Sequence, residues 1–487
     1  MTSLTIHTGN GAQAVYTQMG NMGPQAQFFL DANKSFFKGV TKKHSLFALA
    51  EAFQPFNTSA PGFGGLNTCK FERGGDGIRK LGIAATVSAL TLKTPAAVIA
   101  AESAGNGIID GPDTANNRYV SWHPSIMMFM TDNIDLTIGQ NRFDILYGHN
   151  IAALEAMNGT LDKPQDTLVG GTTIASAFYG SLVNQNLMMD VPFWMGQSET
   201  QMFPHIGLNR YDMYLKWTVK RATDCIVQCN GYRTDGSHNM QDWTTTTYNY
   251  YTNTPALSNL AVLISYVYFD KPERHFFANS VLEYVINCTQ QNQDTSVAAA
   301  QTSIPVRTSM TFPSFRLFWY FLGSEAQKAH CWGDWSGGLY RIQPQGNAAN
   351  GQLVADHAFS TAQFSLNSQQ RTPSHTAGYF KDQQAYYQNS RIPNTFVYQY
   401  NWGLDAESIH DLGYCQLAMI DNFTMTFVRQ GILVSQAAVN TAYASTIVVG
   451  GHAYTDTQSE AATLYINNQY KQLFRLGAGV AGYWFNS

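Results

Sequence analysis

The stretch Tyr211-Asp-Met-Tyr-Leu-Lys-Trp-Thr-Val-Lys220 changes character at every second residue. Its odd positions hold the apolar side chains Tyr211, Met213, Leu215, Trp217 and Val219, and most of the even positions hold polar ones. Successive side chains of a β-strand point to opposite faces, so a period of two is typical of a strand with one buried face. The stretch therefore predicts a half-buried strand in a sheet that covers a core.

Other stretches extend this prediction. Residues 396–402 and 423–427 alternate in the same way, whereas residues 261–269 and 315–322 are apolar at nearly every position. A strand that is apolar on both faces is covered on one side by its own core and on the other by a neighbour. Hairpin turns need positive φ values, which Asn-Gly and Asp-Gly pairs supply, and such pairs occur at 106–107, 158–159, 230–231 and 235–236. The pattern predicts an all-β protein built from antiparallel sandwiches, with few short helices.

One helix start is clear. Asp270 can cap a helix, Pro272 fits the first turn because it lacks only an N–H that would have no partner there, and Glu273 completes the spacing of a capping box. Since the helix comes directly after an apolar strand, we expect it to lie across the end of a sandwich.

The chain of 487 residues is long enough for two or three domains. The polar, low-complexity stretch 242–255 suggests a connection between two of them. We predict an N-terminal arm at 1–24, a first sandwich at 25–220, a connection at 221–256, and a second sandwich at 257–487 with long surface excursions around 323–393.

The charge content is low for a free monomer. Charged residues make up 13% of the chain, whereas 44% is hydrophobic and 13% aromatic, and soluble proteins usually carry about 25% charged residues. Such a surface indicates either that partners cover much of it or that the chain is an Asn- and Thr-rich secreted β-protein. The formal net charge of −4 disfavours direct binding of nucleic acid.

The sequence contains few motifs that are typical of catalysis or of cofactor and metal binding. The run Gly477-Ala-Gly-Val-Ala-Gly482 matches a dinucleotide-binding pattern, but the chain ends too soon for the rest of that unit, so we expect a terminal strand that packs closely. Cys225 and Cys229 lack a second ligand pair, so the six cysteines predict reduced thiols rather than a zinc site. We expect no catalytic residues, no cofactor and no metal.

Modification and targeting signals are also weak. Sequons for N-glycosylation stand at Asn57, Asn158, Asn287 and Asn422, and Asn158, beside a glycine, is the candidate we favour. The N-terminus has no charged start followed by an apolar run of the kind that signal peptides show, and no apolar run is long enough to cross a bilayer.

Several motifs, in order along nearly the whole chain, resemble the major capsid proteins of nucleocytoplasmic large DNA viruses. The most specific is Phe36-Phe-Lys-Gly-Val-Thr-Lys-Lys-His-Ser-Leu-Phe-Ala48, which is similar to the signature F-F-K-x-V-Y-R-R-H-T-N-F-A of that family. The others are Gly11-Ala-Gln-Ala-Val-Tyr16, Arg73-Gly-Gly-Asp76, Val191-Pro-Phe-Trp194, Tyr266-Val-Tyr-Phe-Asp270 with Glu273 and Arg274, Tyr400-Asn-Trp-Gly-Leu404 to Ile420-Asp421, and Leu473-Phe-Arg475 with Gly479 and Gly482.

The chain departs from the family pattern at a few places. Met419 stands where the family has arginine, Lys471 replaces an asparagine, and an extra Phe474 precedes Arg475. These departures mark a divergent member and leave the virus lineage open.

The resemblance implies a double jelly roll, that is, two antiparallel β-sandwiches side by side. It implies a structural role as a homotrimeric, pseudo-hexameric capsomer that tiles the icosahedral shell of a large dsDNA virus. The expected partners are further copies, neighbouring capsomers, and minor capsid and penton proteins, with an internal membrane contacted only indirectly. The expected location is the outer shell of the virion, after assembly in the host cytoplasm. Two alternatives stay open: a minor capsid or penton-associated paralogue of the same fold, and a glycan-binding or glycan-active double β-sandwich protein.

Overall fold

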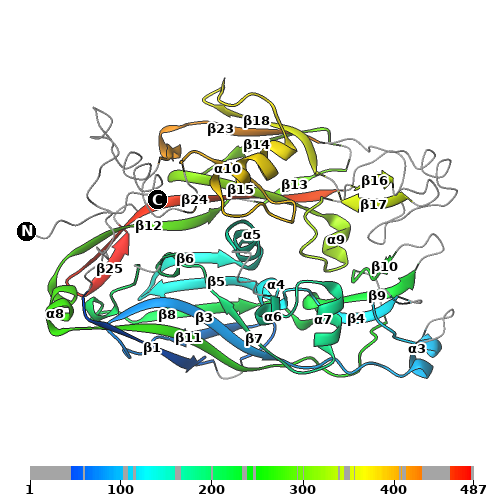
Figure 1. Cartoon of the computed structure of the whole chain (residues 1–487), viewed down its shortest axis with the longest axis horizontal. Coiled ribbons are helices and arrows are strands. Elements are labelled where there is room, and N and C mark those ends of the chain that lie inside the picture. Colours follow the sequence, from blue (N-terminus) through cyan, green and yellow to red (C-terminus); the bar gives the residue numbers. More distant parts are fainter. Residues whose placement is uncertain are drawn as a thin grey trace, which may run out of the picture. The chain divides into compact units, whose positions relative to one another are not determined.

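The structure is a computed structural model of the whole chain (Figure 1). It describes residues 45–483 except 59–60, 102–107, 113, 115–116, 160–165, 199–200, 233–237, 245–247, 293, 300, 338–339, 345–350, 356, 405–406, 408–412 and 430–460. The predicted arm at 1–24 lies outside these residues. Everything below concerns the unit Phe47–Ser487.

The first half of this unit is a sandwich of two four-stranded antiparallel sheets with the orders β1-β11-β3-β7 and β2-β8-β5-β6. Its strands are β1 (Phe47–Pro55), β2 (Leu66–Lys70), β3 (Gly77–Val87), β5 (Thr131–Ile138), β6 (Asn141–Tyr147), β7 (Gln185–Asp190), β8 (Met213–Val219) and β11 (Leu257–Phe269).

The second half repeats this arrangement. Its sheets contain the orders β12-β24-β15-β21 and β14-β23-β18-β19. The strands are β12 (Leu282–Gln291), β14 (Ser303–Thr308), β15 (Pro313–Gly323), β18 (Phe359–Leu366), β19 (Gln369–Gln370), β21 (Tyr398–Asn401), β23 (Phe423–Arg429) and β24 (Ala462–Gly477).

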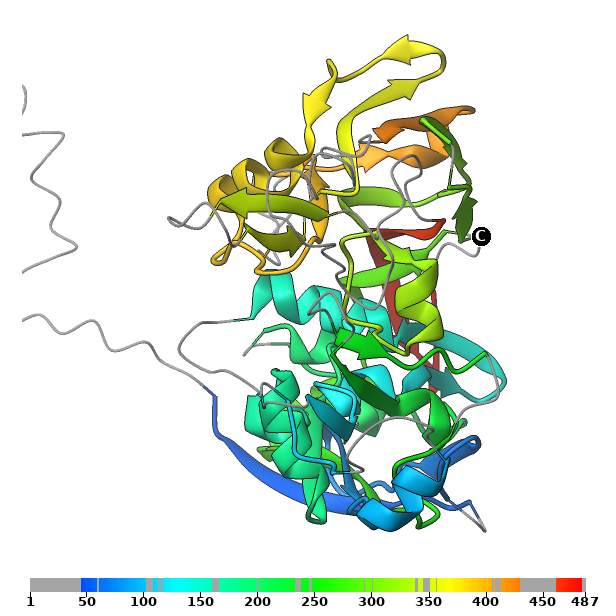
Figure 2. The ribbon, with the colours of Figure 1, turned by 90° about the vertical axis from the view of Figure 1, so that its right-hand side faces the viewer.

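The two halves have the same topology. If the eight strands of each sandwich are counted along the chain, both sandwiches have the sheet orders 1-8-3-6 and 2-7-4-5. A sandwich of eight strands in two sheets with these strand orders is a jelly roll. The chain therefore has the predicted all-β double jelly-roll fold, and Figure 2 shows the two jelly rolls one above the other with β24, in red, at their boundary.

This topology corrects one predicted boundary. We assigned residues 257–269 to the second sandwich, but β11 pairs with β1 and with β3, so it is the eighth strand of the first jelly roll. The polar stretch before it is an excursion between the seventh and eighth strands rather than a connection between domains. It follows β9 (Ile226–Tyr232) and β10 (His238–Met240), and β9 also pairs with β4 (Arg118–Trp122) of the first half.

The second jelly roll has additional short strands. β13 (Thr295–Val297), β20 (His375–Thr376), β22 (Cys415–Gln416) and β25 (Val480–Tyr483) extend its sheets, and β16 (Tyr340–Pro344) pairs with β17 (Gly351–Ala355). The predicted excursion at 323–393 thus includes β18 and β19, which belong to the sandwich itself.

The helices are short. They are α3 (Pro95–Ala101), α4 (Ile126–Phe129), α5 (Gly148–Asn158), α6 (Asp166–Val169), α7 (Ile174–Ser181), α8 (Lys271–Asn279), α9 (Ser324–Lys328), the π-helix η4 (Tyr379–Gln383) and α10 (Gln384–Gln388). None of the helices among the described residues is long and apolar enough to span a membrane.

Local predictions were confirmed in several places. The residues of β8 alternate between buried and half-buried along the strand. Asp270 caps α8 by accepting a hydrogen bond from the Lys271 amide, with Pro272 in the first turn. Ala478 and Gly479, both with positive φ, form the tight turn between β24 and β25. The glycine run at 477–482 is therefore a hairpin of two terminal strands.

Two of the predicted turns are wrong. Asn158 is the last residue of α5, and Asn230 lies inside β9, where it pairs with Arg118. Tertiary pairing overrides the local turn preference at both places. The pairs at 106–107 and 235–236 lie outside the described residues.

Candidate assembly surfaces

The strand β15 separates two hydrophobic cores. Leu317, Trp319 and Phe321 point into the core of the second jelly roll. Phe318, Tyr320 and Leu322, which alternate with them, join the core that also fills the first jelly roll. The sequence predicted that this strand is buried on both faces. One face is buried by each of the two sandwiches. The outer face of the β12-β24-β15-β21 sheet is thus the junction between the jelly rolls.

An aromatic side chain anchors one end of this junction. Phe474 of β24 is fully buried, and its ring lies 5.2 Å from the ring of Phe143 and 5.7 Å from those of Trp194 and Phe203. These three partners belong to the first jelly roll. Phe474 is the extra residue at which the sequence departs from the family pattern. It now has a role, because it fixes the last strand of the second jelly roll in the core of the first.

Polar side chains fill the middle of the junction. Arg316 of β15 is 1% exposed, and its guanidinium donates to the Gln469 amide oxygen at 2.6 Å and to the Asn158 amide oxygen at 2.9 Å. Tyr320 donates to Asn150 at 2.9 Å, and Asn150 donates to Gln291 at 3.2 Å. Asn150 and Asn158 both belong to α5, so this helix carries the first jelly roll's half of the polar contact. Because buried polar groups are costly without partners, these bonds favour one relative placement of the two sandwiches.

A histidine closes the other end of the junction. His149 of α5 stacks on Tyr465 of β24 at 5.9 Å and lies edge-on to Trp332 at 5.7 Å. Its Nε2 is 3.2 Å from the Lys220 ammonium. Burial, together with the charge of Lys220, holds the pKa of His149 well below its ordinary value. His149 is therefore neutral in the folded protein and can accept the hydrogen bond from Lys220.

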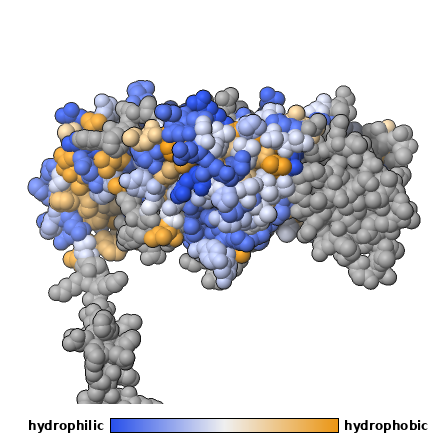
Figure 3. Space-filling model, turned by 90° about the horizontal axis from the view of Figure 1, so that it is seen from above, coloured by the Kyte–Doolittle hydropathy of each residue, from blue (hydrophilic) through white to orange (hydrophobic). Residues whose placement is uncertain are grey.

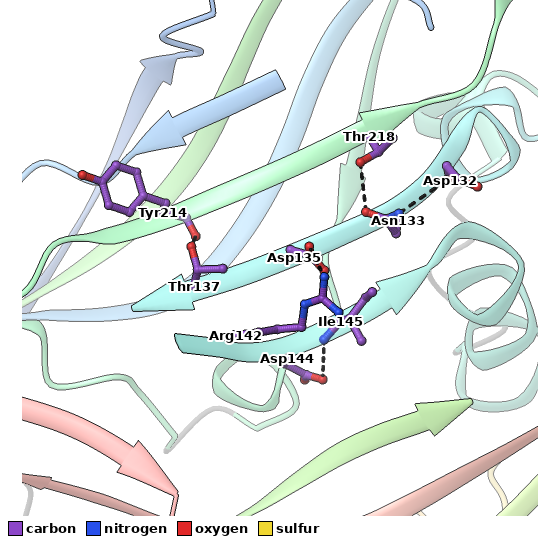
Figure 4. Close-up of polar contacts among 9 residues, drawn as sticks. All are labelled: Asp132, Asn133, Asp135, Thr137, Arg142, Asp144, Ile145, Tyr214 and Thr218. Atoms are coloured by element: carbon purple, nitrogen blue, oxygen red, sulfur yellow. Dashed lines mark hydrogen bonds and ion pairs between the residues drawn. The ribbon is translucent and has the colours of Figure 1, made fainter. Parts of the chain in front are cut away.

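A buried carboxyl group faces the same junction. Figure 4 shows Asp144 on β6, where one oxygen of its carboxyl group accepts a hydrogen bond from the Ile145 amide at 2.9 Å. The neighbouring cation, Arg142, pairs with Asp135 at 3.1 Å instead. Burial raises the pKa of Asp144 from 3.8 to about 8. The group is thus mostly protonated at neutral pH, which spares the junction a buried charge.

Two apolar surfaces are exposed. The outer face of β1 presents Leu49, which is 47% exposed, and Phe53, which is 65% exposed, while the partly buried Leu263 of β11 stands opposite Phe53. In the second jelly roll α10 presents Tyr386 and Tyr387, which are 72% and 78% exposed. Figure 3 shows that hydrophobic patches also interrupt the hydrophilic surface of the second jelly roll. Exposed apolar patches of this kind mark candidate contact sites between proteins.

The residues that the sequence singled out for chemistry do not form a site. Cys225 and Cys229 are buried, and burial raises the pKa of the Cys225 thiol to about 12. Within the described part of the chain, no three His, Cys, Asp or Glu side chains are grouped so that they could hold a metal ion.

The sequons lie in different surroundings. Asn158, the favoured candidate for glycosylation, is half-buried, and its amide oxygen is engaged by Arg316. Asn57 is exposed, Asn422 is half-buried and Asn287 is buried. The glycosylation of Asn158 stays a prediction.

Sequence reasoning missed the polar junction. The sequence does contain signals of this junction. Arg316 interrupts the apolar strand β15, and the polar run Asn467-Asn468-Gln469 interrupts β24. A cation inside a strand with two buried faces indicates that the strand contacts a second, polar layer.

Comparisons with known proteins agree with this architecture. A model described as "Major capsid protein N-terminus" matches residues 35–270, and one described as "Large eukaryotic DNA virus major capsid protein" matches residues 273–482. The boundary between the two models falls where β11 ends and α8 begins.

Similar proteins include the major capsid proteins of Pyramimonas orientalis virus and of Paramecium bursaria Chlorella virus 1, each 23% identical to this chain. The first alignment covers 87% of this chain and 90% of the relative, and the second covers 97% and 96%.

Solved structures share the fold. A chain from the quasi-atomic model of the PBCV-1 virus capsid matches with a TM-score of 0.68 at 18% identity, covering 93% of this chain and all of the other. The Faustovirus major capsid protein matches with a TM-score of 0.63 at 9% identity, over 95% and 96% of the two chains. With two equivalent jelly rolls, a buried junction between them and both family models in sequence, the chain belongs to the major capsid protein family of large eukaryotic DNA viruses.

Proposed function

We propose that this chain is the major shell subunit of a large dsDNA virus and that three copies close into a ring. Such a ring presents six jelly rolls, which make a nearly hexagonal tile for an icosahedral shell. The observation that carries the proposal is the repeat within the chain: two sandwiches of the same topology, held in one arrangement by Arg316, Phe474 and α5. Two jelly rolls held together in this way supply two of the six lobes of the tile, so three copies complete it.

The role is structural. The junction residues are occupied in holding the two jelly rolls together, and the buried thiols and histidines have pKa values that disfavour reactive charged forms. We propose no catalysis and no cofactor. Rings of this kind need contacts that differ on the two sides of each copy, and permanent contacts are rich in apolar and aromatic groups. The exposed faces of β1 and α10 supply such groups.

The location and partners follow from this role. We propose that the chain lies in the outer capsid shell after assembly in the host cytoplasm, that it contacts neighbouring capsomers and minor capsid and penton proteins, and that it contacts neither nucleic acid nor the internal membrane directly. We further propose a division into a first jelly roll that ends at Phe269 and a second that begins at Leu282, with α8 between them. The arm at 1–24 is proposed to lie at the base of the trimer or between neighbours, and surface loops within 323–393 to form part of its outward crown.

Native mass spectrometry of the purified full chain tests the proposal. The subunit mass is 53.9 kDa, so three copies give 3 × 53.9, or about 162 kDa. A stable monomer at micromolar concentration would contradict the trimer. Copy number in stained virion protein separates a major subunit, which should dominate, from a minor or penton-associated paralogue.

A further inference from the structure

The two jelly rolls have the same topology, and each has a helix after its fifth strand. Only in the first jelly roll is this helix covered by the other jelly roll. In the first, α5 comes between the fifth and sixth strands, β6 and β7, and packs on the outer face of the second jelly roll's 1-8-3-6 sheet. In the second, η4 and α10 follow one another between the fifth and sixth strands, β19 and β21. This second-half helix, Tyr379–Gln388, follows the fifth strand of its jelly roll as α5 follows the fifth strand of the other, where α6 and α7 come after α5 in the same interval.

The second-half helix presents one unburied side. Phe380 belongs to the core of its own jelly roll, and Ala385 is fully buried. Gln383, Tyr386 and Tyr387, spaced three and four residues apart, lie on one side of the helix and are exposed. We call these three residues the tyrosine face. Tyrosine pairs a large apolar ring with a hydroxyl, and it is among the residues most enriched at the energetic centres of protein interfaces.

The first jelly roll has the matching sheet face. Residues that pair directly across strands share one side of a sheet, and Phe53 pairs with Leu263, which in turn pairs with Gly82 of β3. Val262 and Ile264 point to the other side, into the core. Leu49, Phe53 and Leu263 therefore lie on the outer side of the 1-8-3-6 sheet, with the exposed Glu51 between the first two, and we call these four residues the sheet face. It is the counterpart of the surface that Phe318 and Tyr320 form in the second jelly roll.

The strand β1 forms the edge of the sheet that carries the sheet face. β1 pairs with β11 along one side, and no strand among the described residues pairs with its other side. Natural edge strands are blunted by lysines, bulges or prolines. β1 has a continuous register, contains no lysine, has Glu51 as its one charged residue, and has its one proline at the last position, Pro55.

We propose that the tyrosine face of one copy packs on the sheet face of the next, repeating between chains the contact that α5 makes within a chain. The inference rests on the proposed trimer and assigns its interface. The elements that carry the two faces lie on the same side of the molecule in Figure 2, where β1 is blue and α10 is gold. A contact between two different surfaces of this kind builds a ring when the rotation from each copy to the next closes, and an open filament when it does not.

A charge-swap experiment on the full chain tests this interface. Tyr387→Glu alone and Phe53→Lys alone should each raise the dissociation constant of the trimer at least about tenfold, as expected at the centre of an interface. The two changes combined should restore much of the affinity, because opposite charges then meet. Sedimentation velocity measures the affinity, and circular dichroism should show unchanged folding, since both residues are exposed. Phe276→Glu, at an exposed phenylalanine of α8, is the matched control and should leave the trimer intact.

A cysteine pair distinguishes the outcomes. Phe53→Cys with Tyr387→Cys should form disulfide-linked trimers under mild oxidation, and Phe276→Cys with Tyr387→Cys should not. Trimers that neither cross-link through the first pair nor respond to the charge swap would overturn this interface while leaving the proposed function standing. A cross-link within one copy would also overturn it, and a wild-type chain that stays monomeric would remove both proposals.

Discussion

Two helices that each follow the fifth strand of their jelly roll have opposite surroundings. α5 has most of its residues buried, because the first jelly roll covers one side and the second jelly roll covers the other. The second-half helix buries Phe380 and Ala385 against its own jelly roll and leaves Tyr386 and Tyr387 to solvent. The difference teaches that the helix after the fifth strand can contact a second jelly roll. Within one chain only α5 has a second jelly roll to contact. Changes at the covered junction should therefore affect folding, and changes at the exposed equivalent should affect only assembly.

Removal of the Phe474 ring should have the largest effect on folding. Phe474→Ala leaves a cavity among Phe143, Trp194 and Phe203. Burial of this kind predicts a loss of about 3–5 kcal/mol in the free energy of unfolding, measured by chemical denaturation. Phe276→Ala, at an exposed phenylalanine, should change little. Equal losses in the two variants would mean that Phe474 does not anchor the junction.

Asp144 should make the junction sensitive to alkali. Its pKa is raised from 3.8 to about 8 in the folded chain, so its contribution to stability is full below pH 4 and is lost as the pH rises through 8. Asp144→Asn stays neutral and should remove this slope, with a relative gain on the order of 4 kcal/mol between pH 5 and pH 8. Thermal melts of both proteins across that range check it. Parallel curves would show that Asp144 is not a buried acid.

His149 acts in the opposite direction. Its pKa is lowered in the folded chain, so its contribution is present above pH 6.5 and is lost as the pH falls. Because both proteins in the comparison contain His149, its effect cancels in the difference.

The hydrogen bond from Tyr320 to Asn150 should have a smaller effect. Tyr320→Phe leaves a buried amide oxygen without that donor, which predicts a loss of about 1–2 kcal/mol in unfolding free energy. Tyr386→Phe, made at an exposed hydroxyl, is the control and should be neutral. A neutral Tyr320→Phe variant would show that the polar layer adds no stability.

The smallest effect on folding should come from the tyrosine face itself. Tyr386→Lys together with Tyr387→Lys should change the unfolding free energy of the monomer by less than about 0.5 kcal/mol, because both side chains are exposed. Denaturation at a concentration where the wild-type chain is dissociated measures this. A loss of several kcal/mol would mean that the tyrosines support the fold and would end their comparison with α5.

The fold could be predicted from local pattern and resemblance, but the junction could not. Alternation identified β8, and a run of apolar residues identified β15 and its two coverings. The strand β11 was recognised but assigned to the wrong jelly roll, because its partners β1 and β3 lie far back in the sequence and pairing over that distance leaves no local signal. The roles of Asp144 and Asn150 depend on which side of a helix or strand meets the second sandwich, and this is set by tertiary packing alone.

The most direct test of the account is a cryo-EM map of the assembled oligomer from purified full chain. We predict three copies around one axis, six lobes, and density for α10 of each copy against β1 and β11 of the next. A ring in which α10 faces solvent would contradict the proposed interface, and a particle with one copy would contradict the assembly itself.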